Sequence, residues 1–116
     1  MARRVAVLAQ DLIWLDRLSN AVAAAGAEPA RATTSSAFAD SLDGADFAVV
    51  DLTARAYDGI EAVTVAADAG ARVLAVGQHD DVDLRKRALA GGADKVLAYR
   101  KLFEDGPATI ARWLAS

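Results

Sequence analysis

The chain has 116 residues, a formal net charge of -3 and no cysteine, which excludes disulfides, thiolate catalysis and cysteine-ligated zinc. Hydrophobic residues make up 54% and charged residues 25%, as in folded globular proteins and not in disordered ones. The weakly acidic balance argues against nucleic acid or an anionic membrane as the main partner. The N-terminal apolar run is too short for a signal peptide and nothing reaches the length of a membrane span, so we expect one cytoplasmic domain over residues 1–116.

The first half of the chain alternates short apolar runs with helical patterns. The run VAVLA at 5–9 is bounded by polar residues and predicts a buried strand. Apolar residues recur at helical spacing over 12–25, and Gly26 ends that helix. We then expect a weaker strand at 28–33, a short helix to Leu42 capped by Ser35 or Ser36, and a strand at 47–50.

The second half repeats the alternation. Asp58 and Glu61 resemble a capping box for a helix that ends near Gly70. Apolar runs at 72–76 and 95–98 predict two more strands. Between them we expect a helix opened by Asp80 or Asp81 and closed by Gly91-Gly92, and after them a last helix that starts at Gly106-Pro107.

Five strands alternating with five helices predict an α/β protein with a parallel sheet covered on both faces. The length and the right-handed crossover rule favour a doubly wound, five-stranded, flavodoxin-like (βα)5 sheet. Functional residues of such sheets lie at the carboxyl ends of the strands. The segments at those ends are Gln10-Asp11, 51–53, 77–79 and 99–101.

Asp51 ends the strand at 47–50, and Asp58-Gly59 follows seven residues later. One interpretation of Asp51 is a strand-ending residue that bonds turn amides, and the other is a reactive carboxylate. The role of Asp11 also has more than one interpretation: a helix N-cap, a metal ligand or both.

These residues and the stretch ALAGGADKVLA resemble the receiver domains (CheY-like) of bacterial two-component response regulators, over nearly the whole chain. The resemblance implies that Asp51 accepts a phosphoryl group from a histidine kinase in a phosphorelay. It also implies a Mg²⁺ site made by Asp11, Asp51 and the Thr53 backbone carbonyl, with Gln10 as a weak ligand.

The chain departs from that family at the positions that handle the phosphoryl group. Gln10 stands where the family has a second acid, so we expect Mg²⁺ binding to be weak. Gly77 replaces a hydroxyl residue, and Tyr99 replaces a lysine. Arg100 or Lys101 can replace the missing lysine charge if the loop shifts register. By resemblance, the expected phosphoryl-contact positions are Gly77, Tyr99 and Lys101.

The aromatic switch residue of the family is also missing, because Val96 occupies its position. By resemblance, the partner surface comprises Arg85, Lys86, Arg87, Val96 and Arg100. We expect an atypical, degenerate receiver without enzymatic activity that regulates a protein partner, either a histidine kinase or a downstream regulator, with a homodimer possible. The alternatives are a phosphorylation-independent pseudo-receiver and, less favoured, a small hydrolase with an aspartate nucleophile in DLT at 51–53.

Overall fold

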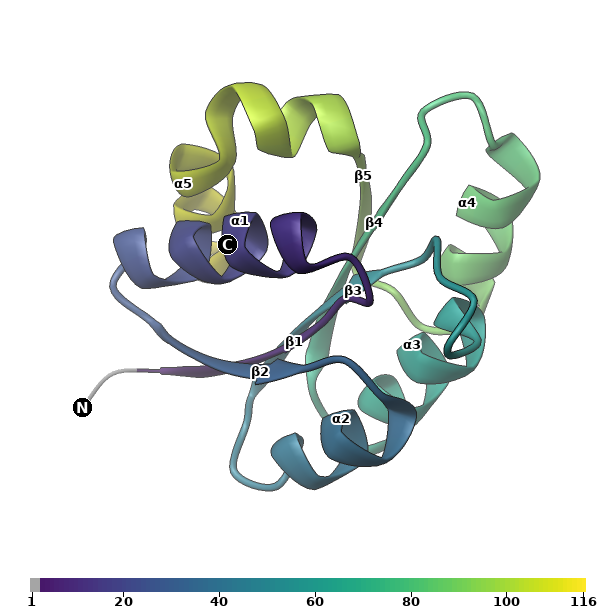
Figure 1. Ribbon diagram of the computed structural model, residues 1–116, viewed down its shortest axis with the longest axis horizontal. Helices are drawn as coiled ribbons and strands as arrows, with labels where there is room; N and C mark the ends of the chain where they lie inside the picture. Colours follow the sequence, from purple (N-terminus) through teal and green to yellow (C-terminus); the bar gives the residue numbers. More distant parts are fainter. Residues whose placement is uncertain (1–2) are drawn as a thin grey trace.

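The computed structural model describes residues 3–116 and contains one five-stranded parallel sheet in the order β2-β1-β3-β4-β5. Ten elements alternate along the chain, as Figure 1 shows. They are β1 (Arg4–Leu8), α1 (Leu12–Ala24), β2 (Glu28–Ala32), α2 (Ser35–Ser41), β3 (Phe47–Asp51), α3 (Gly59–Asp68), β4 (Arg72–Gly77), α4 (Val82–Ala90), β5 (Lys95–Ala98) and α5 (Tyr99–Ala115). The expected doubly wound flavodoxin-like fold is confirmed.

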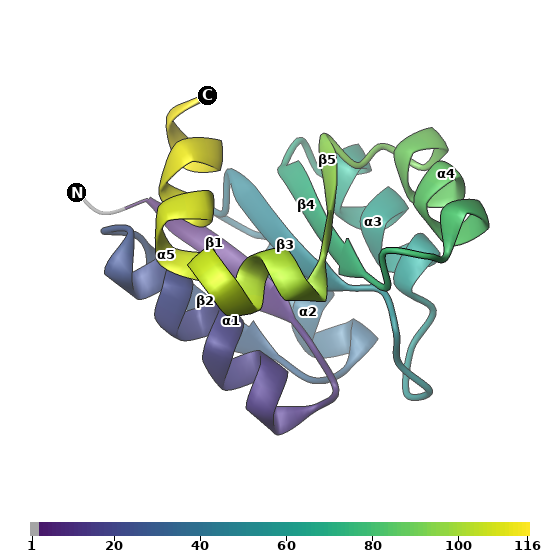
Figure 2. The same ribbon diagram turned by 90° about the horizontal axis from the view of Figure 1, so that it is seen from above.

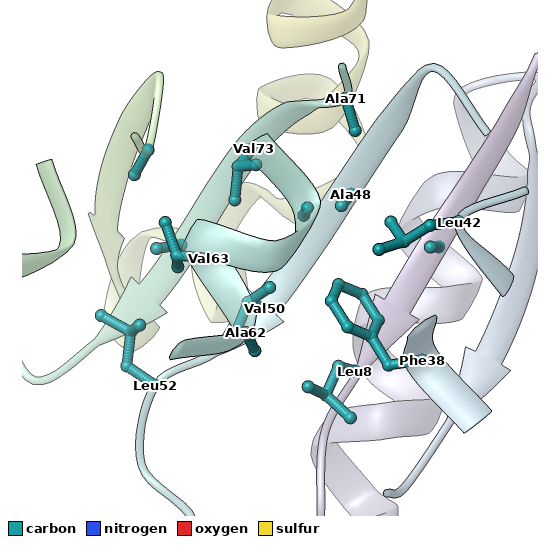
Figure 3. Close-up of a cluster of buried hydrophobic side chains, with 14 of the residues drawn as sticks. Leu8, Phe38, Leu42, Ala48, Val50, Leu52, Ala62, Val63, Ala71 and Val73 are labelled. Carbon is teal, nitrogen blue, oxygen red and sulfur yellow. The ribbon is translucent and has the colours of Figure 1, made fainter. Parts of the chain in front are cut away.

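Helices cover both faces of the sheet, with α1 and α5 on one face and α2, α3 and α4 on the other (Figure 1). The period-2 alternation of the strands divides the core between the faces. In β1, Ala6 and Leu8 face α2 and α3, whereas Val5 and Val7 face α1 and α5. Figure 3 shows the first of these clusters, in which Phe38 lies beside Leu8 and Leu42. None of the helices in residues 3–116 combines the length and apolar character needed to cross a bilayer.

Side-chain caps set the starts of four helices. Asp11, Asp58 and Asp81 accept backbone N–H groups at α1, α3 and α4, which confirms that Asp58 opens the third helix. At α2 the expectation was wrong, since Thr34 is the cap and its Oγ1 accepts from the Ala37 N–H at 3.2 Å. Four consecutive hydroxyl residues at 33–36 made this cap ambiguous in the sequence.

The last helix is the main difference from the sequence expectation. It starts at Tyr99, directly after β5, and not at Gly106-Pro107. Asp105 has non-helical backbone angles and kinks the helix, and Gly106-Pro107 begins its second segment. Figure 2 shows this bend, with α5 lying across α1. The first segment carries Tyr99 to the carboxyl end of the sheet.

Candidate functional site at the carboxyl end of the sheet

The carboxyl ends of β1, β3 and β5 bring three sequence-predicted site residues together. Leu8 of β1 pairs with Val50 of β3, so Asp11 and Asp51 follow neighbouring strands. Burial is the main cause that raises the pKa of Asp51, and Asp11 is close enough for its charge to add to this effect. Tyr99 reaches the same place from the end of β5, where its hydroxyl contacts Asp51.

Asp51 is a buried carboxylate held by neutral donors. The residue is 2% exposed, and its Oδ1 accepts from the Tyr99 hydroxyl and from the Thr53 N–H, the latter at 3.1 Å. The Tyr57 hydroxyl donates to the Asp51 backbone carbonyl at 2.7 Å. Among residues 3–116, no lysine or arginine nitrogen forms an ion pair with Asp51. Its negative charge is therefore met by hydrogen bonds alone.

Burial dominates the electrostatics of this cluster. Desolvation raises the pKa of Asp51, while the bonds from Tyr99 and Thr53 lower it in part. The pKa of Tyr99 is raised by burial and by its bond to Asp51, so its phenol keeps the proton that it donates. Burial and the Asp51 charge likewise raise the pKa of Tyr57. The hydroxyls stay donors over the whole neutral range.

Two side chains expected to bind metal accept hydrogen bonds from backbone N–H groups instead. Asp11 is the N-cap of α1, and its Oδ1 accepts from the Ile13 and Trp14 N–H groups at 2.9 and 3.1 Å. Gln10 Oε1 accepts from the Arg55 and Ala56 N–H groups at 2.7 and 3.1 Å, so it holds the loop between β3 and α3. The N-cap interpretation of Asp11 is thereby confirmed.

A hollow of about 480 Å³ opens beside these residues, lined by Gln10, Asp11, Thr53, Ala54 and Arg55. Within residues 3–116, no three His, Asp or Glu side chains gather closely enough to hold a metal ion. Asp51 already accepts two donors on one oxygen, and Gln10 is tied to the loop. This donor set fits a divalent cation poorly, because hard cations prefer several free oxygen ligands.

The expected phosphoryl-contact positions differ in what they offer. Gly77 ends β4 and is buried, and a Cβ there would lie 3.5 Å from Leu52 Cδ1. Leu52 therefore borders the place where a hydroxyl side chain would stand. Tyr99 donates to Asp51, and Lys101 is exposed in the first turns of α5.

The expected partner surface is exposed on α4 but not on β5. Arg85, Lys86 and Arg87 are all solvent-exposed. Val96 is only 8% exposed and belongs to the core, so it offers a partner almost no surface. Arg100 is exposed, and its Nε donates to Glu104 at 2.8 Å.

The Asp58-Gly59 pair has a structural explanation. Asp58 Oδ1 accepts from the Ile60 and Glu61 N–H groups at the start of α3. A Cβ on Gly59 would lie 2.7 Å from the Leu52 carbonyl oxygen and 2.8 Å from its Cα, so no other residue fits without moving that backbone. This close approach packs α3 against the segment that follows Asp51.

Sequence reasoning missed the roles of Tyr57 and Trp14. Tyr57 lies six residues beyond Asp51, and nothing in its spacing indicates that its hydroxyl turns back. The Trp14 ring lies 4.8 Å from the Tyr99 ring, centroid to centroid. The only available signal was that Trp14 falls one helical turn after Asp11.

Comparison with solved structures shows what this geometry resembles. The BeF3-activated DrrB receiver domain is 19% identical, each chain covers 100% of the other, and the TM-score is 0.85. A response regulator from Thermotoga maritima is 15% identical, again with 100% of both chains covered and a TM-score of 0.82. The Vibrio cholerae chemotaxis protein CheY4 is 16% identical, with 99% of this chain and 98% of that chain covered and a TM-score of 0.82.

No protein-family model matches the sequence, and no curated protein sequence matches it. The structural likeness extends over the full chain. The chain therefore has the CheY-like fold of response-regulator receiver domains.

Proposed function

We propose that this chain is a signalling module with a receiver fold that regulates a partner protein by contact, largely without phosphorylation of Asp51. The observation that supports this most is the bond from the Tyr99 hydroxyl to the buried Asp51 carboxylate. By the family resemblance, Tyr99 stands where a lysine would bind an incoming phosphoryl group. The receiver fold of the structural neighbours supports the two-component signalling role.

The chemistry of acyl phosphate formation explains why Tyr99 matters. A carboxylate oxygen must attack phosphorus while positive groups offset the charge of both reactants. Asp51 Oδ1 instead accepts two neutral donors, and burial raises the pKa of Asp51. Removing one preorganised donor costs a factor of about 10² to 10³ in rate. The hydroxyl and the lysine are both replaced, at Gly77 and Tyr99, so self-phosphorylation should be very slow.

Metal support for the reaction is also reduced. One structural neighbour, a response regulator from Burkholderia pseudomallei, carries a phosphorylated aspartic acid and a calcium ion. Here Asp11 would be the main charged ligand besides Asp51, with Thr53 lining the hollow beside it. We propose weak Mg²⁺ binding at most, and no step of the proposed function depends on it.

The proposed partner is another protein, either a histidine kinase or a downstream regulator. The exposed basic residues Arg85, Lys86 and Arg87 on α4 form its candidate contact surface. Clustered positive side chains favour a partner surface of complementary negative charge. We propose a cytoplasmic location, and a homodimer stays a prediction.

The test is intact-mass spectrometry after incubation with a small phosphodonor and Mg²⁺. Neither the wild type nor the Asp51→Asn control should gain the mass of a phosphoryl group. A repaired variant, Gln10→Asp with Gly77→Thr and Tyr99→Lys, should become phosphorylated and show that the conditions suffice. Rapid, stoichiometric phosphorylation of the wild type would overturn the proposal. Continuous release of inorganic phosphate dependent on Asp51 would instead support the hydrolase alternative.

A further inference from the structure

A continuous series of contacts leads from Asp51 to the surface between α1 and α5. The Tyr99 hydroxyl donates to Asp51, and the Tyr99 ring packs on Trp14 with centroids 4.8 Å apart. The Arg17 guanidinium lies 5.4 Å from the Trp14 ring centroid and 4.5 Å from that of Phe103. These five side chains join a buried carboxylate to an exposed aromatic residue.

The series ends in a groove of about 520 Å³ between α1 and α5, the two helices that cross in Figure 2. Ile13, Arg17 and Phe103 line it, and Ile13 and Phe103 are 68% and 62% exposed. The Arg17 Nε is buried without a hydrogen-bond partner among the described residues. Arg17 is therefore held mainly by its two aromatic neighbours, so a movement of Trp14 changes its surroundings.

We infer that the hydrogen bond from Tyr99 to Asp51 couples two features of the protein. These are whether the Asp51 carboxylate oxygen is free to accept a bond, and how the side chains of the groove between α1 and α5 are arranged. This inference deepens the proposed function, because it assigns an output route to the receiver fold. A change at one site reaches another only through contacts that differ between two states. The Tyr99 hydroxyl supplies such a contact, since it is held while the Asp51 oxygen is free to accept and released when that oxygen is occupied or removed.

The position of Tyr99 in the chain supports this role. Tyr99 is the first residue of α5, and Ala98 before it supplies no side-chain cap. The bond to Asp51 thus anchors a helix start that has no capping side chain of its own. Leu102 and Phe103 of the same short segment line the groove, and the kink at Asp105 separates this segment from the rest of α5.

The route differs from one through α4 and β5. Val96 is a buried aliphatic residue without a polar group, so it has no hydrogen bond to gain or lose when Asp51 changes. Tyr99 points its polar atom at Asp51 and its ring at α1. The contacts therefore favour α1 and α5 as the surface that responds to Asp51, whereas the candidate partner contact on α4 does not depend on it.

The experiment is a double-mutant cycle followed by amide and indole NMR. Its variants are Asp51→Ala, Tyr99→Phe and the double variant, without any phosphodonor. The Trp14 indole N–H is the reporter, and the Trp113 indole N–H, which donates to Asp94 Oδ2 at 3.1 Å, is the internal reference for an intact fold. Tyr57→Phe is the matched control, since it removes a hydroxyl that bonds the Asp51 backbone and not its carboxylate.

Asp51→Ala should shift the Trp14 indole signal and the Arg17 and Phe103 amides in the wild-type background. The same substitution should produce little or no shift there once Tyr99 is phenylalanine, whereas the response should persist in the Tyr57→Phe background. Equal shifts with and without the Tyr99 hydroxyl, or no shift in the wild-type background, would overturn the inference. If Asp51→Ala disturbs the Trp113 reference, Asp51→Leu, which also lacks an acceptor oxygen, is read by the same criteria. Because no phosphoryl group is involved, phosphorylation of the wild type would refute the proposed function and leave this result standing.

Discussion

Two aspartates at opposite ends of the sheet each accept a hydrogen bond from an aromatic side chain, yet their electrostatics differ. Asp51, at the carboxyl end of β3, accepts from Tyr99, and burial raises its pKa. Asp94, just before β5, accepts from Trp113 at 3.1 Å and from Arg72 at 2.7 Å. The Arg72 bond is the main reason why the pKa of Asp94 is lowered. The decisive difference is a cation, which only Asp94 has.

This difference separates a structural site from the candidate functional one. Arg72 also donates to the backbone carbonyl of Ser116 at 2.7 Å, so the Asp94 cluster fastens the end of α5 to the sheet. At Asp51 the protein buries a charge with no cation beside it, which opposes folding. Such uncompensated groups are concentrated at functional sites. The two clusters should therefore respond in opposite ways to the same kinds of substitution.

The largest effect is expected at the structural end. Trp113 is 1% exposed and packs edge-on against Phe47, with ring centroids 5.3 Å apart. Trp113→Ala should lower the free energy of unfolding by about 3–5 kcal/mol, because it leaves a cavity. Urea denaturation measures this loss. Trp14→Ala is the matched control on partly exposed Trp14 and should cost less; an equal or larger cost for Trp14 would contradict the assignment of the structural role to the Asp94 end.

A carboxylate added at position 10 should help a metal ion to bind beside Asp51. Asp51 would then have a cation next to it, as Asp94 has Arg72. Gln10→Asp should raise Mg²⁺ affinity about tenfold, equivalent to about 1.4 kcal/mol. A Mg²⁺ titration followed by Trp14 fluorescence provides the measurement, with Gln10→Ala as the control for loosening the loop. Unchanged affinity in Gln10→Asp would mean that position 10 does not reach a cation in the hollow.

Neutralising Asp51 should stabilise the fold. The folded-state pKa of Asp51 is raised, so the stability gained by protonating it is present at low pH and is lost as the pH rises through that pKa. Asp51→Asn should raise the free energy of unfolding at pH 7 by about 1 kcal/mol, the usual size of such functional-site gains. Urea denaturation from pH 7 downward should show this advantage shrinking on acidification. A less stable variant at pH 7 would show that the ionised carboxylate is net favourable.

Neutralising Asp94 should have the opposite sign and the smallest size. The pKa of Asp94 is lowered, so its stabilisation is present at neutral pH and is lost as the pH falls through the folded-state pKa. The Asp94 and Arg72 side chains are 40% and 37% exposed, and solvent screening limits the pair to about 0.5–1 kcal/mol. Asp94→Asn should therefore lower stability slightly at pH 7, and less so in high salt. A stabilising effect would remove the contrast with Asp51.

Local patterns predicted most of the fold. Four of the five strands are recognisable from the apolar runs at 5–9, 47–50, 72–76 and 95–98. Asp58 is recognisable as a cap from its spacing to Glu61. The sequence does not predict the first segment of α5, YRKLFE, because Gly106-Pro107 after it is so strong a signal for a helix start. Its own residues are mostly good helix formers.

The site was predictable by position but not by contact. Asp11 and Asp51 meet because parallel strands end at one edge, which the sequence implies. The bond from Tyr99 to Asp51 joins residues 48 positions apart, and the bonds from Arg55 and Ala56 to Gln10 span 45 and 46. Such contacts depend on tertiary packing, and no local pattern encodes them.

The central claim is that the Tyr99 hydroxyl holds the Asp51 carboxylate and that Asp51 is not an ordinary phosphoryl switch. The most direct test uses beryllium fluoride with Mg²⁺ as a phosphoryl mimic. Amide NMR spectra of the wild type should stay nearly unchanged over α4 and β5 when the mimic is added. The repaired variant described above, with Val96→Tyr added to restore the missing aromatic residue, should show shifts there under the same conditions. Widespread, saturable shifts over α4 and β5 of the wild type would contradict the account, because they would show that Tyr99 yields the carboxylate to a phosphoryl group and that Arg100 or Lys101 supplies the missing charge.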